Sequence, residues 1–423
     1  MDPKRVYDTK DQIAGGDGPL GRQLVRDIGA LAAIERPSAS SGEEEAARWV
    51  ASRLNEIGLE AEIQPFRFNP DYWSVWGLHA LAAAAVAGLA ASANRLARAA
   101  SLASALIAAS YCGELTTEFS LLRRLLPSRS SYNVMARLPD PAAHRLLIVC
   151  AHHDAARTGF LFHPTVFRAL TASTRWRRLH LSPLAVPLVA MVTGTLAAAV
   201  RGRRARPGLA RSSLLLTGLV NLGFATLMLD IGRSPVTPGA NDNASGVAVL
   251  LGLAETLRRK RPRGWEVWFL STGSEEGMLG GMRAFEQRFR KDLRDRHAFV
   301  LNLELLGSGR ITYLQGEGFL RRVQYHPEAL ALAGQVTDEL GWRKAGPIAV
   351  PPFVTDALVV ARLAIPALTV ISVDEAGRFP HYHGMSDTPQ AIDIGSVRDA
   401  YVFCRSLIDH LAEETPEAGD GRM

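Results

Sequence analysis

The chain has 423 residues, of which 47% are hydrophobic and 21% are charged, and its formal net charge is +6. This length is compatible with one large domain that carries insertions. The positive charges are nearly all arginines, scattered without interleaved aromatic residues, which argues against a nucleic-acid partner. Cys112, Cys150 and Cys404 are odd in number and far apart, so they build neither a disulfide framework nor a cysteine metal knuckle.

The N-terminal region carries charges and lacks the apolar segment of a secretory signal peptide. From residue 21 to residue 58 apolar and polar residues alternate at helical spacing, and Ser41 lies where it can cap a helix that opens with Glu43, Glu44 and Glu45. Residues 59–68 predict a strand. After this strand the composition changes abruptly to long apolar runs.

Four apolar runs follow in two pairs, residues 73–94 with 99–113, and residues 179–200 with 212–229. A helix needs about 20 apolar residues to cross the hydrocarbon core of a bilayer. The first and third runs reach this length, the fourth is borderline and the second is short. We therefore predict two membrane hairpins, which would make the protein an integral membrane protein in contact with the lipid bilayer.

A soluble interpretation of the same runs stays open, because their abundant alanine contributes little to membrane insertion. In that interpretation the four segments are buried helices of a lid. A basic stretch adjoins each hairpin, at residues 119–129 and 166–180, and we expect each to lie in the membrane interface.

Arginines lie at both ends of the hairpins, so the positive-inside tendency nearly cancels. The tips carry Arg95, Arg98, Arg201, Arg203, Arg204, Arg206 and Arg211, and the side of the folded domain carries Arg123, Arg124, Arg129, Arg168, Arg175, Arg177 and Arg178. A long charged N-terminal segment without a signal peptide is hard to translocate. We therefore expect the folded domain to face the cytoplasm.

Outside the hairpins, strand and helix patterns alternate. The short apolar runs 144–151, 264–272, 297–307 and 365–373 are typical of parallel strands buried on both faces. Helical patterns lie between and after them. The alternation predicts an α/β fold with a central, mostly parallel mixed sheet flanked by helices and two inserted hydrophobic helical hairpins. The predicted divisions are a folded domain at 1–70, 131–162 and 236–415, hairpin insertions at 71–130 and 163–235, and a disordered tail at 416–423.

Polar groups follow each predicted strand at its C-terminal end, which is the edge where open α/β sheets bind ligands. Each has an ordinary interpretation alone, as a strand-end histidine, a helix cap, a solvated helix start or an ion-pair partner. Together at one edge they indicate a metal site, because carboxylates do not crowd together without a cation. The groups are His152, His153 and Asp154; Ser274, Glu275 and Glu276; Glu304; His381 and His383; and Asp242 at the start of a helix.

The blocks AHHDA, PGANDNASG, SEEGMLGG, LNLELLG and HYHGMSDT occur in this order, with the less specific TDALVVARLAIPALTV before the last. In this order and on these elements the chain resembles the co-catalytic zinc exopeptidases, which include bacterial and fungal aminopeptidases and glutamate carboxypeptidase. The resemblance covers the chain apart from the N-terminal tail and the two hairpins. It implies the exopeptidase fold and two Zn²⁺ ions per chain, which lie about 3.5–4 Å apart in such sites.

The resemblance also implies a role for each matching residue. His152 and Glu304 would bind the first ion, Glu276 and His383 the second, and Asp242 would bridge both. Asp154 would orient His152, and His153 would not be a ligand. Glu275 would be the general base that takes a proton from the attacking water, and Tyr382 would donate a hydrogen bond to the oxyanion. A cis peptide bond is expected between Asp242 and Asn243.

Two departures from the family pattern stand out. Glu304 occupies a position where aspartate is common, and we expect the longer side chain still to bind the metal. The segment between His152 and Asp242 is a short loop in the family, whereas here it contains the second hairpin. Because this insertion must emerge beside the cleft, we predict that it shapes substrate access.

The function that follows is a zinc-dependent metallopeptidase, most simply an aminopeptidase that acts on a peptide or aminoacyl substrate. A single-zinc enzyme of the glutaminyl cyclase kind and a catalytically inactive membrane receptor or scaffold are the alternatives. The complete set of expected ligands and the base favours the peptidase. Metal content separates the three, at two ions, one ion or none. The pattern leaves open which residue is released, whether the substrate is a peptide or another amide, and the oligomeric state.

Overall fold

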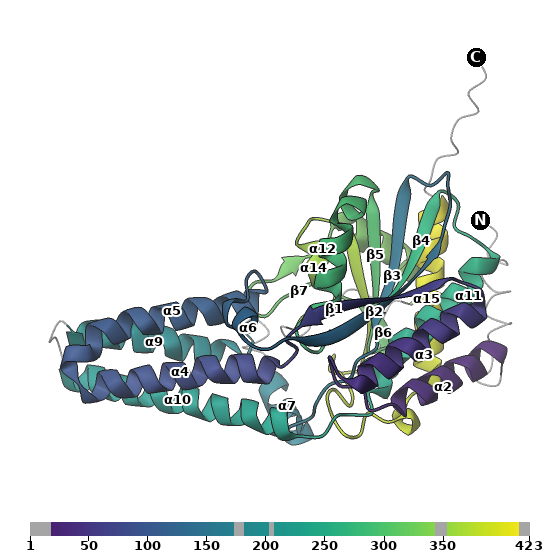
Figure 1. Ribbon diagram of the computed structural model, residues 1–423. Coiled ribbons are helices and arrows are strands. Elements are labelled where there is room, and N and C mark those ends of the chain that lie inside the picture. Colours follow the sequence, from purple (N-terminus) through teal and green to yellow (C-terminus); the bar gives the residue numbers. More distant parts are fainter. Residues whose placement is uncertain (1–17, 173–181, 203–206, 343–352, 414–423) are drawn as a thin grey trace, which may run out of the picture.

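The computed structural model describes residues 18–172, 182–202, 207–342 and 353–413. The predicted tail at 416–423 and several of the arginines counted above, including Arg175, Arg177 and Arg203, lie outside the described residues. Within them, an α/β domain and a long bundle of helices lie end to end (Figure 1).

A seven-stranded sheet in the order β1-β2-β4-β3-β5-β9-β6 forms the centre of the α/β domain. The inner strands β4, β3, β5 and β9 run parallel, and β1, β2 and β6 pair antiparallel outside them, so the sheet is mixed with a parallel centre as predicted. The bounds are β1 (Ala61–Phe68), β2 (Arg129–Leu138), β3 (Arg145–His152), β4 (Trp265–Thr272), β5 (Ala298–Glu304), β6 (Arg310–Tyr313) and β9 (Ala367–Val373), with a separate pair β7 (Gly316–Glu317) and β8 (Val323–Gln324).

The position of the inner strands explains why their sequences are continuously apolar. Every residue of β5 and β9 is buried, because helices cover both faces of the parallel centre, and only continuous apolar runs suit such positions. The sequence pattern did not predict β2, which starts with polar residues. Ser131 and Asn133 are nevertheless buried there, since Ser131 donates to Glu43 and Asn133 donates to the carbonyl of Gly281.

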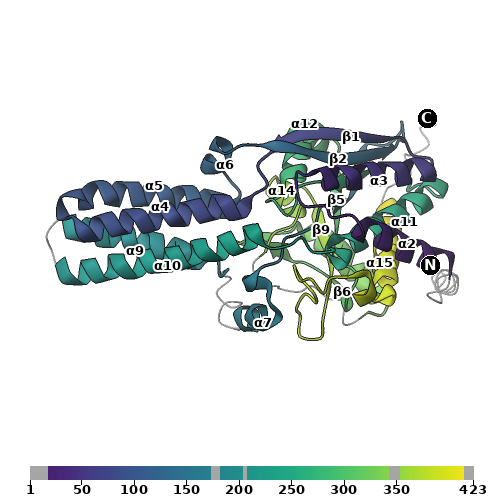
Figure 2. The same cartoon turned by 60° about the horizontal axis from the view of Figure 1, so that its bottom comes forward.

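Helices cover both faces of the sheet (Figures 1 and 2). The first group contains α2 (Pro19–Ala32), α3 (Ser41–Ile57), α11 (Ser245–Arg259) and α15 (Ile394–Glu413), and the second contains α12 (Gly280–Asp295) and α14 (Ala357–Ala361). Helix α13 (Pro327–Glu339) packs against α15. The cap of α3 is Ser40, whose side chain accepts from the backbone of Glu43, and Ser41 is the first helical residue rather than the predicted cap.

The four apolar runs form a bundle of α4 (Tyr72–Ser92), α5 (Ala97–Thr116), α9 (Ala185–Gly202) and α10 (Pro207–Arg233). Helix α4 packs against α10, and α5 packs against α9, so the two hairpins lie side by side (Figure 2). All four helices are long and apolar enough to cross a membrane by length and composition. Helix α5 is longer than its predicted apolar run, because polar residues at both ends join the helix.

Side-chain size is distributed unusually in this bundle. Alanine dominates the interior towards the hairpin tips, where Ala90 and Ala198 are almost fully buried, and large residues such as Trp76 and Tyr111 fill it nearer the sheet. Large apolar side chains point outward, and Leu102, Leu106 and Leu219 are 70%, 73% and 67% exposed. A soluble bundle places its large apolar residues inside, whereas membrane helices pack through small residues and present large ones to lipid.

We expected the basic stretch 119–129 to lie in the membrane interface, and the position of Arg123 corrects this expectation. It lies on the short helix α6 (Leu121–Leu125) and is buried rather than exposed at a surface. Its guanidinium pairs with Glu114 of α5 at 3.0 Å and donates to the carbonyls of Asn69 and Gly277. This arginine therefore fastens the first hairpin to the loop after β4. Much of the second basic stretch, residues 173–180, lies outside the described residues.

The remaining elements are short. They are the helix α7 (Pro164–Ala172) and the single turns Asn94–Leu96, Phe160–Phe162, Ala240–Ala244 and Pro389–Ala391.

Candidate metal centre

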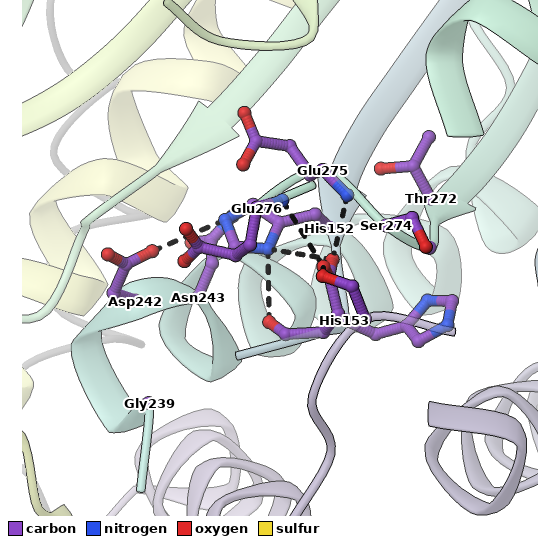
Figure 3. A network of polar contacts seen from close by, with 12 residues as sticks. His152, His153, Gly239, Asp242, Asn243, Thr272, Ser274, Glu275 and Glu276 are labelled. Atoms are coloured by element: carbon purple, nitrogen blue, oxygen red, sulfur yellow. Dashed lines mark hydrogen bonds and ion pairs between the residues drawn. The ribbon is translucent and has the colours of Figure 1, made fainter. Parts of the chain in front are cut away.

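The predicted ligands converge at the C-terminal edge of the parallel strands. His152 ends β3 and Glu304 ends β5, while Glu275 and Glu276 lie in the loop that follows β4. Asp242 lies in the turn before α11, and its carboxylate faces His152 and Glu276 (Figure 3). His383 reaches the same place from the loop after β9. Parallel strands bring their carboxyl ends to one edge, which explains why residues so distant in sequence meet here.

Two triads of metal-binding groups share Asp242. In the first, Nε2 of His152 lies 3.3 Å from Oδ1 of Asp242 and 3.2 Å from Oε1 of Glu304. In the second, Nε2 of His383 lies 3.5 Å from Oδ2 of Asp242 and 3.1 Å from Oε2 of Glu276. The ligand atoms of each triad lie within 4.8 Å of one another, and the combination of His152, Glu275 and Glu276 also meets this limit.

The donor set suits zinc, which takes imidazole nitrogens and carboxylate oxygens. The groups are buried, with His152, Asp242 and Glu304 only 1%, 3% and 5% exposed. One carboxylate oxygen on each of Asp242, Glu276 and Glu304 is buried and has no hydrogen-bond donor among the residues that the structure describes. Buried oxygens of this kind are costly unless a donor or a cation meets them, so the residues present fit a bound metal.

The electrostatics of the cluster agree with this fit. Burial, together with neighbouring carboxylates, raises the pKa of Glu304 to about 7 and raises that of Glu276. Burial opposes a charge on His152, yet Glu304 and the other facing carboxylates raise its pKa well above the usual value. The side chains therefore hold protons among themselves, and a divalent cation would displace those protons.

Asp154 connects His152 at the end of β3 with the loop after β4 that carries Glu275 and Glu276. Its carboxylate lies 3.4 Å from Nδ1 of His152 and accepts from the hydroxyl of Ser38. It also accepts from the backbone N–H groups of Glu275 and Glu276, at 3.1 and 3.2 Å. Burial opposes its charge, but hydrogen bonding and the charge of His152 hold the pKa of Asp154 below its ordinary value. One carboxylate thus orients the histidine and positions the loop that carries both glutamates.

Glu275 stands apart from the two triads that share Asp242. In Figure 3 its carboxylate points away from Asp242, whereas that of Glu276 points toward it. Burial and the like charges of Glu304 and Glu276 raise the pKa of Glu275 well above its usual range. A carboxyl group beside the metal-binding groups and with raised basicity has the properties of a proton acceptor.

Tyr382 is packed among aromatic rings. Its ring stacks on His383 with centroids 3.9 Å apart and contacts Phe167 and Phe379 at 5.5 and 5.7 Å. Burial raises the pKa of Tyr382 well above its usual value, so its hydroxyl stays protonated and able to donate. Phe162 packs against the other side of this group, with its ring 4.5 Å from that of His383.

Two histidines of the sequence motifs lie outside the triads. The ring of His153 points away from Asp242 (Figure 3) and bonds the hydroxyl of Ser271, and burial lowers its pKa to about 3. His381 bonds Ser386 through Nδ1. The peptide bond between Asp242 and Asn243 is cis, as the resemblance implied.

The sequence reasoning gave no role to Asp387, although it lies in the quoted block HYHGMSDT. Its carboxylate accepts from the backbone N–H groups of Asn241 and Asp242, at 2.7 and 3.0 Å. Burial raises the pKa of Asp387 to about 7. This residue therefore fixes the turn that presents Asp242. A buried aspartate four residues after His383 gives no periodic signal by which to find it.

The sequence pattern placed Glu43 at the opening of a helix and gave it no further role, and the structure shows that it is fully buried. Its carboxylate accepts from the backbone of Ala39 and Tyr132, from the hydroxyl of Ser131 and from the backbone of Ser274, at 2.6–3.1 Å. It thereby holds Ser274, which immediately precedes Glu275. Burial raises the pKa of Glu43 to about 7.

Arg36 is another buried support. Its guanidinium donates to the carbonyls of His153, Pro238 and Gly239, each at 2.7 Å. Gly239 has φ of +62°, and a Cβ there would lie 2.6 Å from the carbonyl oxygen of Asp242. The turn before Asp242 therefore requires glycine.

A cavity of about 500 Å³ adjoins the candidate centre. Glu275, Glu276, Tyr382 and His383 line one end of it. The rest is lined mainly by apolar residues of α4, α10, the start of α9 and the segment around Phe162. The second hairpin thus forms part of the wall of the cleft.

Comparisons with known proteins agree with the fold and the motifs. The family model described as peptidase family M28 matches residues 229–408, which include all the expected ligands except His152. Aminopeptidase YwaD of Bacillus subtilis (strain 168) is 37% identical over 75 residues, a segment that spans 18% of this chain and 16% of that relative's length.

Solved structures share the fold over most of the chain. The aminopeptidase from Aneurinibacillus sp. strain AM-1 is 16% identical, with 92% of each chain covered and a TM-score of 0.51. Fimbriiglobus ruber glutaminyl cyclase is 15% identical, with coverage of 92% and 94% and a TM-score of 0.53. The zinc aminopeptidase BSAP from Bacillus subtilis is 13% identical, with coverage of 92% and 95% and a TM-score of 0.53.

Proposed function

We propose that this chain, whose residues 229–408 match the peptidase family M28, is a zinc exopeptidase of that family and a membrane-anchored hydrolase that cleaves amide bonds with two zinc ions, most simply as an aminopeptidase. The observation that carries the proposal is the pair of triads that share Asp242. A carboxylate with an imidazole on each side is the arrangement expected of a bridged pair of ions.

The metal ligands in this proposal are His152, Asp242, Glu276, Glu304 and His383. Zinc bound there would lower the pKa of a water molecule to about 7 and polarise the substrate carbonyl. Nε2 of His152 approaches Glu304 at 3.2 Å, which supports Glu304 as a ligand in place of the usual aspartate. The longer side chain is accommodated at the end of β5.

Glu275 has the role of general base in the proposal. It accepts the proton of the attacking water and passes it to the nitrogen of the leaving amine, which departs as the amide bond breaks. The adjacent residue Glu276 faces Asp242 and His383 instead, so one glutamate of the pair is free for proton transfer. Asp154 keeps both in place through their backbone N–H groups.

Tyr382 has the role of hydrogen-bond donor to the oxygen that gains negative charge as the carbonyl carbon becomes tetrahedral. Its raised pKa supports this role, because a tyrosinate could not donate. Stacking on His383 fixes the ring, so the hydroxyl is held beside the second triad.

The helix bundle anchors this enzyme in a membrane. The support is the outward placement of large apolar side chains around an interior that alanine dominates towards the hairpin tips, which the soluble lid interpretation does not predict. His79, a polar residue inside the bundle, is bonded internally to Ser110 and to the carbonyl of Val75. The cytoplasmic side for the catalytic domain stays a prediction from the sequence, as do the domain boundaries.

The test combines metal analysis with a substrate screen. Purified protein supplied with zinc is expected to hold two ions per chain and to release the amine from aminoacyl amides or the amino acid from acyl-amino acids. Asp242→Asn removes the shared carboxylate and should lose both ions and activity. One ion per chain with cyclisation of N-terminal glutamine would replace the proposal with a cyclase, and the absence of any bound zinc would replace it with a receptor or scaffold.

A further inference from the structure

The cavity beside the metal centre has two chemically different ends. The end at the sheet edge is lined by Glu275, Glu276 and His383, and the other end is enclosed by helices of the bundle. Along α10 the lining runs from Ile231 back to Val220. At 1.5 Å per residue, this stretch of helix is roughly 16 Å long.

The bundle end of the cavity is apolar. The residues that α10 contributes are Val220, Gly223, Phe224, Leu227, Met228 and Ile231, and none of them carries a charge or a hydrogen-bonding side chain. Tyr72 and Trp76 of α4 form the facing wall, with Trp76 only 4% exposed. Apart from the indole N–H of Trp76 and the hydroxyl of Tyr72, this end offers few hydrogen-bonding groups. A peptide that entered it would therefore leave most of its backbone N–H and C=O groups without partners, which costs several kcal/mol per group.

The same helices present large apolar side chains to the outside. Leu216, Leu219 and Leu222 of α10 are 64%, 67% and 48% exposed, next to the cavity-lining residues Val220 and Gly223. Gly223 of α10 and Val186 of α9 line the cavity and are also exposed, so the cavity reaches the outer, apolar surface of the bundle. The cavity wall and the outer face of the bundle are both apolar. A hydrocarbon chain that partitions into the bilayer is the occupant that suits both of these surfaces.

We propose that the substrate of this enzyme is a lipid-like amide, in which an unbranched alkyl chain attached to the scissile amide occupies the apolar cavity along α10. This inference rests on the proposed amide hydrolase and names its substrate class. The metal centre holds the amide, and the chain extends along α10 beside the start of α9. The chain belongs either to the acyl part or to the amine part of the substrate, and both present the same hydrocarbon to the cavity.

Chain length gives the quantitative expectation. Each buried methylene should raise kcat/KM about fourfold, which corresponds to about 0.8 kcal/mol. An extended chain advances about 3.3–3.6 Å per three backbone bonds, so roughly 16 Å accommodates about 14 bonds. The gain should stop at about that length.

The experiment uses the full-length protein, loaded with zinc, in phosphatidylcholine vesicles. Two substrate series are compared, N-acyl-leucines and leucyl-alkylamides, each with chains of two to sixteen carbons. The expected result is that kcat/KM rises with chain length in one of the two series and levels off at about 14 carbons. The series that responds identifies the part of the substrate that carries the chain.

Long chains also partition into vesicles, so a matched pair of variants isolates the cavity. Gly223 lines the cavity, and a Cβ there meets nothing within 4 Å. Gly88 of α4 is also free of neighbours within 4 Å, but it is exposed outside the cavity. Gly223→Phe should reduce the ratio of long-chain to short-chain kcat/KM at least tenfold. Gly88→Phe should leave this ratio unchanged.

Three outcomes overturn the inference. They are a flat dependence on chain length in both series, a maximum at groups the size of a leucine or phenylalanine side chain, and an equal effect of the two glycine variants. Each of them leaves the amide hydrolase standing if short substrates are cleaved. Failure to cleave any substrate while zinc is bound would instead remove the proposed function. Zinc content of each variant reports whether its catalytic domain is intact.

Discussion

The edge of the sheet and the interior of the helix bundle both bury polar groups, but they satisfy them differently. In the bundle several partners are internal, as in the hydrogen bonds of Thr195 with Ser104 and of His79 with Ser110. The buried atoms there that have no partner among the described residues, such as Trp76 Nε1 and Asn221 Oδ1, are scattered. At the sheet edge, oxygens of Asp242, Glu276 and Glu304 have no donor within the described part of the chain. A buried group without a partner costs stability, so three such carboxylate oxygens gathered at one place indicate a cation, whereas an internally bonded group indicates architecture alone.

The largest expected effect is on kcat and zinc content, and it differs between the neighbouring residues Glu275 and Glu276. Glu275→Gln should lower kcat by about 10²–10⁴-fold with zinc content unchanged, because the variant loses the proton acceptor and keeps the metal-binding groups. Steady-state kinetics and metal analysis of the same preparation measure both quantities. Glu276→Gln is the matched variant and should lose zinc. A Glu275→Gln protein with the wild-type kcat would contradict the assignment of the base.

The joint between the two regions should be the next most sensitive position. Arg123→Met leaves Glu114 as an unpaired buried charge and should cost about 3–5 kcal/mol of stability, measured by thermal unfolding in detergent. Arg124 is exposed beside it, and Arg124→Ala should have little effect. The double variant Glu114→Gln/Arg123→Met should lose less than the sum of the single changes. Purely additive losses would show that the pair does not act as a unit.

The stability of the fold should depend on pH through Glu317, a buried carboxyl group that lies outside the two triads of the candidate metal centre. Glu317 accepts from the hydroxyls of Tyr325 and Thr355 at 2.6 and 3.1 Å, and burial raises its pKa to about 8 from an ordinary value of 4.5. The folded protein therefore binds more protons than the unfolded chain between these values, so stability should fall as pH rises from about 4.5 to about 8.

The measurement compares wild type with Glu317→Gln, which removes the titrating group and keeps an acceptor oxygen. The free energy of unfolding of wild type relative to the variant should fall by about 4 kcal/mol at most from pH 5 to pH 8. A difference that stays constant across this range would show that Glu317 is ionised throughout.

The smallest expected effect tests the outer face of the bundle. Leu106 lies near the middle of α5 and is 73% exposed. Leu106→Arg should oppose membrane integration by about 2.5–3.5 kcal/mol, seen as protein released from membranes by alkaline carbonate. Leu125→Arg is the control, because Leu125 is 76% exposed on α6 outside the four apolar helices. Equal behaviour of the two variants would favour the soluble lid.

The sequence determined the fold class and the residues gathered at the sheet edge. Continuous apolar runs predicted the parallel strands. His152 and Glu304 lie at the C-terminal ends of two such strands, and the C-terminal ends of parallel strands meet at one edge of the sheet. The four long apolar runs likewise predicted the helical hairpins of the bundle, because the length and composition of a run are enough to predict an apolar helix. These features follow from local patterns, and local patterns are what a single sequence displays.

Tertiary structure alone decided which polar residues support the site. Glu43 has the sequence context of a helix start, and Arg123 that of a basic interface helix, yet both are buried with partners from distant elements. Asp387 fixes the turn at Asp242 through backbone contacts that leave no periodic trace. The apolar cavity is also of this kind, because it exists only where α4, α10 and the metal-binding edge come together. Burial and pairing depend on neighbours that the chain order does not specify.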